Sequence, residues 1–457
     1  MAAADLRAGT TRVGARRLIS AAGFRRLLLS RFAAQWGDGL FQAGLAGAVL
    51  FNPERAADPA AIVGGFTVLL LPYSIVGPFA GALLDRWDRR RVLVVANLLR
   101  GALILVTSVA VAAGMSGLPL YTGALLAVGI SRFVNSGLSA ALPHVVEPRL
   151  LVEANAVATT LGAAVSVAGA ACAVGLRALA GAGNAGSGWV TAAAAIGSVL
   201  AVVPVTGFIR GYLGPDRVDE PGQTVIAVAR GLVDGGRAAH RAPGVAAGFV
   251  ALFAHRAAFG ASLLITVLLL RYTFHDMGPF RAGMAGLGEV AVGGGAGLLV
   301  AGLCTPRIVR RVGRERTVCG SLVLAAATQI GLGLPMLLPT ILVAAFLLTA
   351  AGQMIKLCVD SAVQQDIADE TRGRVFALYD TLFNITQVVA IALAATVVPI
   401  SGQAPGVVVA ATALYLIGMT GYLLIIRRRA GSAGEGAAAA GTAGAAPAAD
   451  RLGNRDL

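Results

Sequence analysis

The chain consists of long apolar stretches separated by short polar segments that are rich in arginine. An α-helix needs about 20 predominantly apolar residues to cross the hydrocarbon core of a bilayer, and these stretches reach that length. The pattern predicts twelve membrane-spanning helices, over residues 27–51, 60–84, 91–114, 118–141, 153–179, 187–209, 244–271, 280–304, 317–337, 339–360, 374–399 and 404–427. We therefore expect an all-α polytopic membrane protein.

The polar segments divide the chain into two halves of six predicted helices each. The expected parts are a basic cytoplasmic N-terminus over 1–26, a bundle over 27–209, a cytoplasmic linker over 210–243, a second bundle over 244–427 and a disordered cytoplasmic tail over 428–457. Within the linker, residues 224–240 have apolar positions at helical spacing. They predict a helix that either lies on the inner leaflet or is solvated.

Composition agrees with a membrane protein, because 57% of the residues are hydrophobic, only 13% are charged and the mean hydropathy is +0.78. The net charge of +14 comes from arginines at the ends of apolar stretches rather than along a soluble face. Nucleic-acid binding is therefore not expected. The four cysteines and four histidines have no metal-ligand spacing, and we expect no metal, cofactor or disulfide.

The distribution of arginine predicts the orientation. With both termini inside, the outer loops hold only Arg55, Arg271 and Arg281, whereas the inner segments hold the arginine clusters. Cytoplasmic loops are enriched in Arg and Lys. The near absence of lysine and the excess of Ala and Gly are typical of a GC-rich bacterium. We expect a multi-pass protein of the bacterial plasma membrane with both termini cytoplasmic.

The two halves resemble each other in their loops. The basic loops 86–91 and 311–316 lie about 225 residues apart, and the loops 142–148 and 363–370 lie about 219 apart. Because both pairs of loops are separated by nearly the same number of residues, they indicate that the two halves arose by duplication and form pseudo-symmetric bundles. In transporters built this way, the substrate site lies at the repeat interface near the middle of the membrane.

The segment 77–93, GPFAGALLDRWDRRRVL, joins the second and third predicted helices. It resembles the loop 2–3 signature of the major facilitator superfamily, although Asp88 stands where that family usually has glycine. Together with Gly37-Asp38-Gly39 and the loop Asp366 to Arg374, it resembles the bacterial drug-efflux branch of macrolide, enterobactin and lysophospholipid transporters.

The resemblance implies a gate at the cytoplasmic side. Asp85, at the end of the second helix, is expected to contact Arg374 and the start of the eleventh helix when the outside is open. The expected gating residues are Gly81, Asp85, Arg86, Arg89, Arg90 and Arg374. The alternative is that these charges only anchor and orient the hairpin.

Charged residues inside the predicted spans are costly and therefore mark function. Asp38 and Glu289 are the candidate proton carriers, with a structural hydrogen bond as the alternative for Asp38. Arg132, in GISRFVNSG, resembles the fourth-helix motif of exporters, where a buried arginine is implicated in proton transfer, although the end of that motif differs here. Arg100 and Arg256 either belong to the same cavity or pair with such acids.

Two further residues of the tenth helix, Lys356 and Asp360, stand four apart and predict an ion pair along the helix.

No nucleotide-binding motif is present, so we expect neither an enzyme nor direct use of ATP. The favoured function is a monomeric, proton-coupled exporter of small amphipathic or hydrophobic molecules by alternating access. A lipid or siderophore exporter, a metabolite uptake carrier and a membrane scaffold or sensor remain as alternatives. The substrate is not predicted.

Overall fold

The computed structural model describes residues 21–52, 62–68, 71–72, 87–147, 150–214 and 224–443. Its named elements are α2 (Ala22–Leu50), α4 (Arg89–Ala112), α5 (Leu118–Ala141), η1 (Leu142–His144), α6 (Leu151–Ala180), α7 (Asn184–Thr206), α8 (Thr224–Arg241), α9 (Pro243–Leu268), η3 (Leu269–Thr273), α10 (Gly283–Val312), α11 (Arg314–Thr328), η4 (Gln329–Gly333), α12 (Leu338–Asp366), α13 (Asp369–Ala395) and α14 (Pro405–Ala443). The described part of the chain is thus almost entirely helical.

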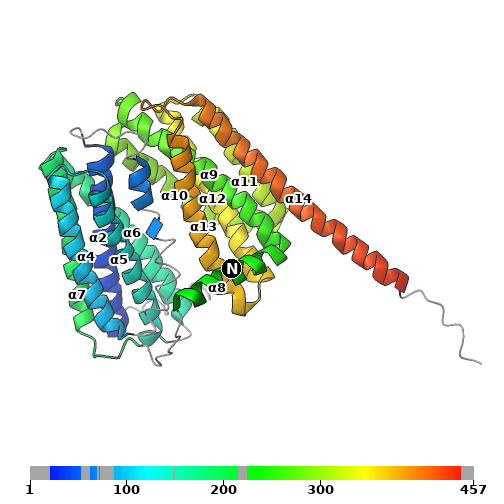
Figure 1. Ribbon diagram of the computed structural model, residues 1–457, viewed down its shortest axis with the longest axis horizontal. Helices are drawn as coiled ribbons and strands as arrows, with labels where there is room; N and C mark the ends of the chain where they lie inside the picture. Colours follow the sequence, from blue (N-terminus) through cyan, green and yellow to red (C-terminus); the bar gives the residue numbers. More distant parts are fainter. Residues whose placement is uncertain are drawn as a thin grey trace, which may run out of the picture.

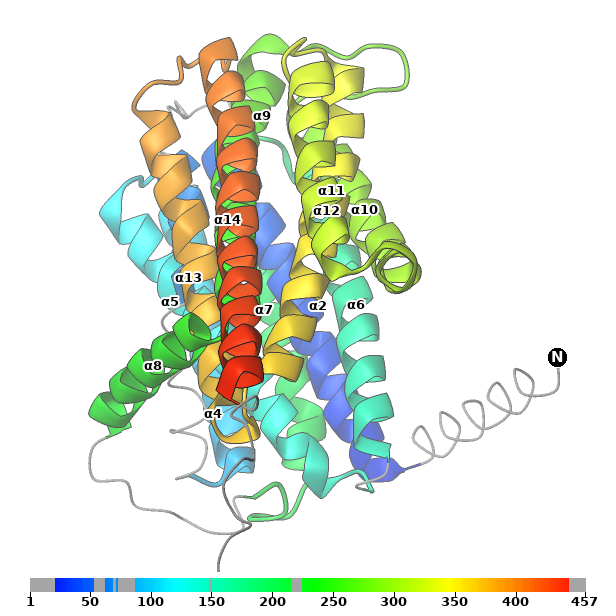
Figure 2. The ribbon, with the colours of Figure 1, turned by 90° about the vertical axis from the view of Figure 1, so that its right-hand side faces the viewer.

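The helices form two bundles that stand side by side (Figure 1). The first contains α2, α4, α5, α6 and α7, and the second contains α9 to α14. In the first bundle, α4 and α7 lie on the side away from the second bundle, and α5 and α6 lie on the side toward it. α8 lies outside both bundles, and Figure 2 shows it running at a steep angle to the membrane-spanning helices.

The helices match the predicted spans closely. Residues 62–68 and 71–72 are helical, and the rest of the predicted span 60–84 lies outside the described residues. Nine helices in the described part of the chain are long and apolar enough to cross a membrane. α2 is not among them, because Gln35, Asp38, Gln42 and several glycines make it less apolar than the other spans.

Local sequence signals set several helix ends. The side chain of Asp88 caps α4 by accepting a hydrogen bond from the backbone N–H of Arg90 at 3.1 Å. Proline in the first turn begins α5, α9 and α12, where its missing N–H costs nothing. Gly313, with φ of +86°, separates α10 from α11 in a conformation that only glycine adopts readily.

The last helix is longer than expected. We predicted that it ends at residue 427 and that a disordered tail follows, but α14 continues to Ala443. The extra turns are rich in alanine, which has the highest helix propensity, and they extend a helix that is already nucleated. Residues 444–457 of the expected tail lie outside the described residues.

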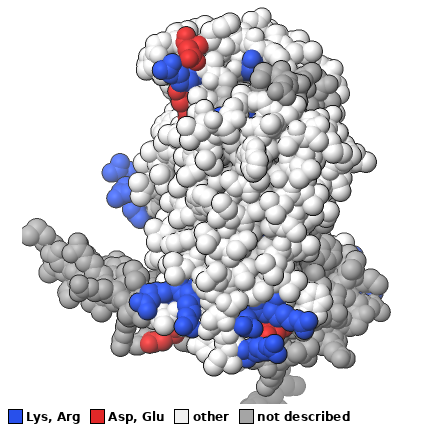
Figure 3. All heavy atoms as spheres, turned by 90° about the vertical axis from the view of Figure 1, so that its left-hand side faces the viewer, with Lys and Arg blue, Asp and Glu red and all other residues white. Residues whose placement is uncertain are grey.

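Basic side chains form clusters at one end of the first bundle. Figure 3 shows basic groups at the bottom of the first bundle, below a broad band of uncharged residues. Arg26 donates to the carbonyl of Gly207 at 2.7 Å and Arg90 to that of Thr206 at 3.0 Å, so the starts of α2 and α4 meet the end of α7 here. We call this the basic end. Guanidinium groups are stabilised at this end because the carbonyls at the C-termini of helices carry partial negative charge.

The apolar core differs between the two ends. At the end opposite the basic end, one cluster of buried side chains contains residues of both bundles, for example Leu45 and Val49 of α2 with Leu264 and Leu268 of α9. Toward the basic end, each bundle has a core of its own within the described residues. Among the described residues, the bundles therefore share an apolar core at one end only.

Glycine lets α2 lie very close to its neighbours in the first bundle. A Cβ atom at Gly197 of α7 would lie 2.7 Å from the Cα atom of Gly37. On the other side of α2, a Cβ at Gly169 of α6 would overlap the carbonyl of Trp36, and one at Gly39 would overlap that of Ser166. Small residues allow such close approach between membrane helices.

We predict that Gly169→Val destabilises the protein, because the added side chain has to push α6 away from α2. The expected cost is at least about 1–3 kcal/mol, as for overpacking in a core. Gly175→Val is the matched control, since a Cβ there meets nothing within 4 Å and the helix is the same. Thermal unfolding of the purified variants in detergent measures the effect. Equal melting temperatures for the two variants would show that this contact is not tight.

Candidate functional site

An ion pair lies inside the first bundle. Nη1 of Arg100, on α4, is 3.0 Å from Oδ1 of Asp38, on α2. Arg100 is fully buried and Asp38 is only 6% exposed. Removing one partner of such a buried pair costs about 3–5 kcal/mol, because the other charge is left without compensation. The pair therefore fixes α2 against α4.

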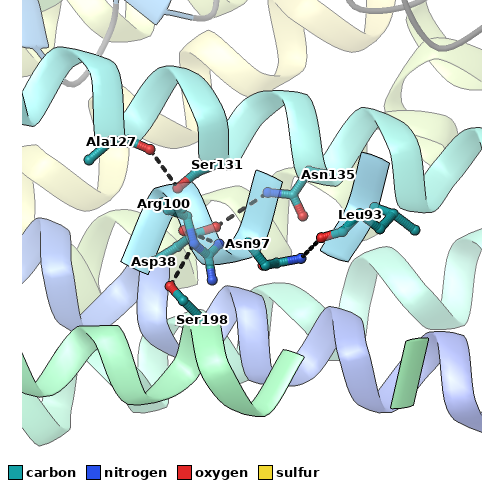
Figure 4. Close-up of polar contacts among 8 residues, drawn as sticks. All are labelled: Asp38, Leu93, Asn97, Arg100, Ala127, Ser131, Asn135 and Ser198. Atoms are coloured by element: carbon teal, nitrogen blue, oxygen red, sulfur yellow. Dashed lines mark hydrogen bonds and ion pairs between the residues drawn. The ribbon is translucent and has the colours of Figure 1, made fainter. Parts of the chain in front are cut away.

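Two further helices supply polar partners to this pair (Figure 4). Nε of Arg100 donates to the hydroxyl of Ser198, on α7, at 2.9 Å. Nδ2 of Asn135, on α5, donates to the free carboxylate oxygen of Asp38 at 3.3 Å. Four helices thus meet at one carboxylate and one guanidinium.

A second arginine lies near the same carboxylate. Arg132 stands one turn before Asn135 on α5 and is within electrostatic range of Asp38. The structure thus brings together Asp38, Arg100 and Arg132, which the sequence singled out separately. A group that neutralises Asp38 would weaken its attraction to both arginines.

The second bundle has a different arrangement around Arg256, on α9. The guanidinium carbon of Arg256 lies 3.9 Å from the ring centroid of Phe383, on α13, and 5.9 Å from that of Phe259. Cation–π contact of this kind stabilises a desolvated cation by about 2 kcal/mol. No ion pair of Arg256 with a carboxylate occurs among the described residues. Arg256 therefore differs from Arg100, which has an acid partner.

Around Tyr379 lie a lysine and two acids. Lys356 and Asp360, both on α12, form the expected ion pair at 2.8 Å. The ammonium of Lys356 also lies 5.3 Å from the ring centroid of Tyr379. Asp380, the next residue on α13, interacts electrostatically with Lys356 and has an exposed side chain.

Glu289 lies near the start of α10 rather than at mid-membrane. Its carboxylate accepts hydrogen bonds from the backbone N–H of Arg281, at 3.2 and 3.3 Å. In the same turn, Asp276 accepts from the backbone N–H of Ala282 at 2.9 Å and from the Arg281 side chain at 3.0 Å, and these bonds lower the pKa of Asp276. Both acids thus hold the segment that enters α10.

The expected gating residues Gly81, Asp85 and Arg86 lie outside the described residues. Arg89 donates to the carbonyl of Ala140 at 3.0 Å, which joins the start of α4 to the end of α5.

Arg374 contacts an acid that the sequence did not single out. Its Nη1 lies 3.3 Å from Oδ2 of Asp234, on α8. Gly235 packs against the same turn of α13, since a Cβ there would lie 2.7 Å from the Arg374 carbonyl. Asp234 lies within the amphipathic segment that predicted α8, but its partner could not be read from that pattern.

Sequence reasoning also passed over His255, which is only 4% exposed. Its Nε2 lies 3.1 Å from the carbonyl oxygen of Leu348, on α12. Its ring packs against Tyr415 of α14, and Gly352 leaves the space that the imidazole fills. An isolated histidine in an apolar stretch gives no signal of such a role.

The end opposite the basic end is closed by contacts across the bundles. Nη2 of Arg271, from the second bundle, donates to the carbonyl of Asn52, from the first, at 3.1 Å. Arg177 donates to the adjacent carbonyl of Phe51 at 2.8 Å. Met284 of α10 packs against Gly47 of α2. The C-terminal carbonyls of α2 thus hold one arginine from each bundle.

Comparison with known proteins identifies the family. A model of the Major Facilitator Superfamily matches residues 27–391. Two curated relatives, described as uncharacterized MFS-type transporters of Mycobacterium bovis and Mycobacterium tuberculosis, are each 45% identical over 410 residues, which cover 89% of this chain and 91% of the relative.

Solved structures of transporters share the fold. The nucleoside transporter NupG is 13% identical, with a TM-score of 0.63 over 88% of this chain and 99% of its own. A peptide transporter of the POT type is 17% identical, with a TM-score of 0.64 over 89% and 95%. Sequence identities this low support only a shared fold. With the two bundles and the family match, the chain belongs to the major facilitator superfamily of multi-pass membrane transporters.

Proposed function

We propose that this protein is a proton-coupled exporter of small amphipathic or hydrophobic molecules from the bacterial cytoplasm. The membership of the superfamily supports secondary transport, and the sequence resemblance to its drug-efflux branch favours export. The observation that carries alternating access is that, within the part of the chain that the structure describes, the bundles share an apolar core at one end only. A carrier that rocks about a central site needs one such closed end at a time.

In this proposal, the basic end faces the cytoplasm, as the excess of arginine favours. The conformation is then open to the cytoplasm and closed at the outer end. The cluster of Leu45, Val49, Leu264 and Leu268 provides the apolar part of the outer closure, and Arg271 on the Asn52 carbonyl provides a polar part. The apolar contacts and the Arg271 hydrogen bond both have to break when the outer end opens.

Asp38 is the proton carrier in this proposal. Protonation removes the charge that holds Arg100 and attracts Arg132, so it loosens the junction of α2 with α4 and α5. A coupling site needs such a link between proton binding and helix packing. Glu289 is retained as a second candidate carrier, although its contact with the Arg281 backbone favours a positioning role.

The cytoplasmic gate remains part of the proposal: Asp85 contacts Arg374 when the basic end closes. Arg374 is paired with Asp234 while that end is open, and both side chains are about half exposed, at 51% and 43%. An exposed ion pair contributes only about 0–1 kcal/mol. Arg374 can therefore leave Asp234 and pair with Asp85 instead at little cost in free energy.

We predict that the double variant Asp38→Asn/Arg100→Gln folds but no longer uses a proton gradient. Changing both residues avoids leaving one buried charge unpaired, which is the main risk of Asp38→Asn alone. The measurement is gradient-driven uptake of a panel of fluorescent amphiphiles into inverted vesicles. The variant Glu289→Gln is measured in parallel. Unchanged gradient-driven uptake by the double variant would remove Asp38 from the coupling role.

We predict that Arg271→Ala favours the conformer that is open at the outer end. A hydrogen bond from a charged group contributes about 1.5–3 kcal/mol, so the ratio of conformers should shift about tenfold or more. Spin labels at positions 118 and 277, with the native cysteines replaced, report the distance between the bundles at this end. Arg281→Ala is the matched control, because its side chain binds Asp276 within the second bundle. The same distance distribution in both variants would contradict the proposed closure.

A further inference from the structure

Basic side chains outnumber acidic ones in the interior of the described spans. The basic residues away from the helix ends are Arg31, Arg100, Arg132, Arg256 and Lys356, and the acidic ones are Asp38, Glu289, Asp360 and Asp380. Asp38 pairs with Arg100, and Asp360 pairs with Lys356. Arg256 is in neither of these pairs.

Arg256 is the clearest case of a cation without an anion. Its guanidinium lies on the Phe383 ring at 3.9 Å, and its Nε has no hydrogen-bond partner among the described residues. The side chain is only partly buried, so part of it is accessible. A guanidinium carries five donors in a planar fork that matches a carboxylate or phosphate.

A buried hydroxyl without a partner lies beside this cation. Tyr379 is 1% exposed, and its hydroxyl has no hydrogen-bond partner among the described residues. Arg256 and Tyr379 are close enough to interact electrostatically. Buried polar groups are nearly always satisfied, so an unsatisfied one beside a free cation needs an explanation.

Aromatic rings extend along α13 from this point. Tyr379 lies 6.4 Å from Phe376 and 5.8 Å from Phe383, measured between ring centroids. Figure 1 shows α13 on the side of the second bundle that lies toward the first. The cation, the hydroxyl and the aromatic rings thus occur together where α9 meets α13, a helix that borders the first bundle.

We propose that Arg256, Tyr379 and Phe383 bind the acidic group of an anionic amphiphile, and that the transported substrates belong to this class. The guanidinium of Arg256 donates to the acidic group, and the Tyr379 hydroxyl donates a further hydrogen bond. The apolar body lies against the aromatic rings of α13. This inference rests on the proposed transport function and narrows its substrate class.

Binding to the purified full-length protein in nanodiscs of zwitterionic lipid tests the inference. The probes are dodecanoate and dodecyl phosphate as anions, with 1-dodecanol and dodecyltrimethylammonium as neutral and cationic controls of the same chain length. Thermal unfolding across a concentration series gives the apparent affinity of each probe. We expect at least one anion to bind at least tenfold more tightly than the alcohol or the cation.

Variants separate a binding site from nonspecific attraction. Arg256→Gln should abolish the preference for anions, and Arg256→Lys should weaken it because the fork of donors is lost. Arg26→Gln is the matched control at the basic end, where the side chain binds the Gly207 carbonyl. Tyr379→Phe should raise the melting temperature without ligand, because it removes an unsatisfied hydroxyl, yet weaken anion binding about fivefold or more. A purely structural tyrosine would not give opposite effects.

The inference is wrong if the alcohol binds as tightly as both anions, or if Arg256→Gln folds and keeps the anion preference. Its failure is distinct from failure of the proposed function, since binding is measured without a gradient. Gradient-driven transport of neutral or cationic probes without anion binding would overturn only the substrate class. Anion binding that depends on Arg256, with no gradient-driven transport of any probe, would overturn only proton-coupled export.

Discussion

The ion pair between Asp38 and Arg100 is the interaction on which the first bundle depends. It is buried at the junction of α2 with α4, and Ser198 and Asn135 extend it to α7 and α5. Charges are expensive inside a membrane, so the pair has to be well compensated, and glycine at positions 37 and 39 brings the neighbouring helices close enough to α2. The same compensation makes the junction sensitive to any change in charge. A proton on the carboxylate is the smallest such change.

The two bundles use charge in different ways. In the first, Asp38 and Arg100 neutralise each other, whereas in the second, which also holds the Lys356–Asp360 pair, Arg256 rests on an aromatic ring. The first arrangement is suited to a proton, because protonation breaks an existing contact. The second is suited to a substrate, because a ligand supplies the missing anion. A division of coupling and binding between the bundles follows naturally from a duplicated fold whose halves have diverged.

Much of the fold could be predicted from the sequence, because apolar length and arginine position are local signals. The helices, the intramembrane charges and the Lys356–Asp360 pair could all be read from spacing along the chain. The contacts between distant segments could not. No pattern distinguishes Ser198 from other serines in an apolar stretch, or shows that Phe383 would face Arg256 rather than an acid. The length of α14 was misjudged because a low-complexity composition was taken as disorder, although its alanines favour helix.

The central claim is that protonation of Asp38 changes how the two bundles sit relative to each other. The most direct test measures distances between spin labels at the basic ends of the two bundles in nanodiscs, at acidic and at neutral to alkaline pH. The account predicts that the distance distribution shifts with pH in the wild-type protein and is independent of pH in Asp38→Asn/Arg100→Gln. A wild-type distribution that does not change with pH, or an equal shift in the double variant, would contradict it.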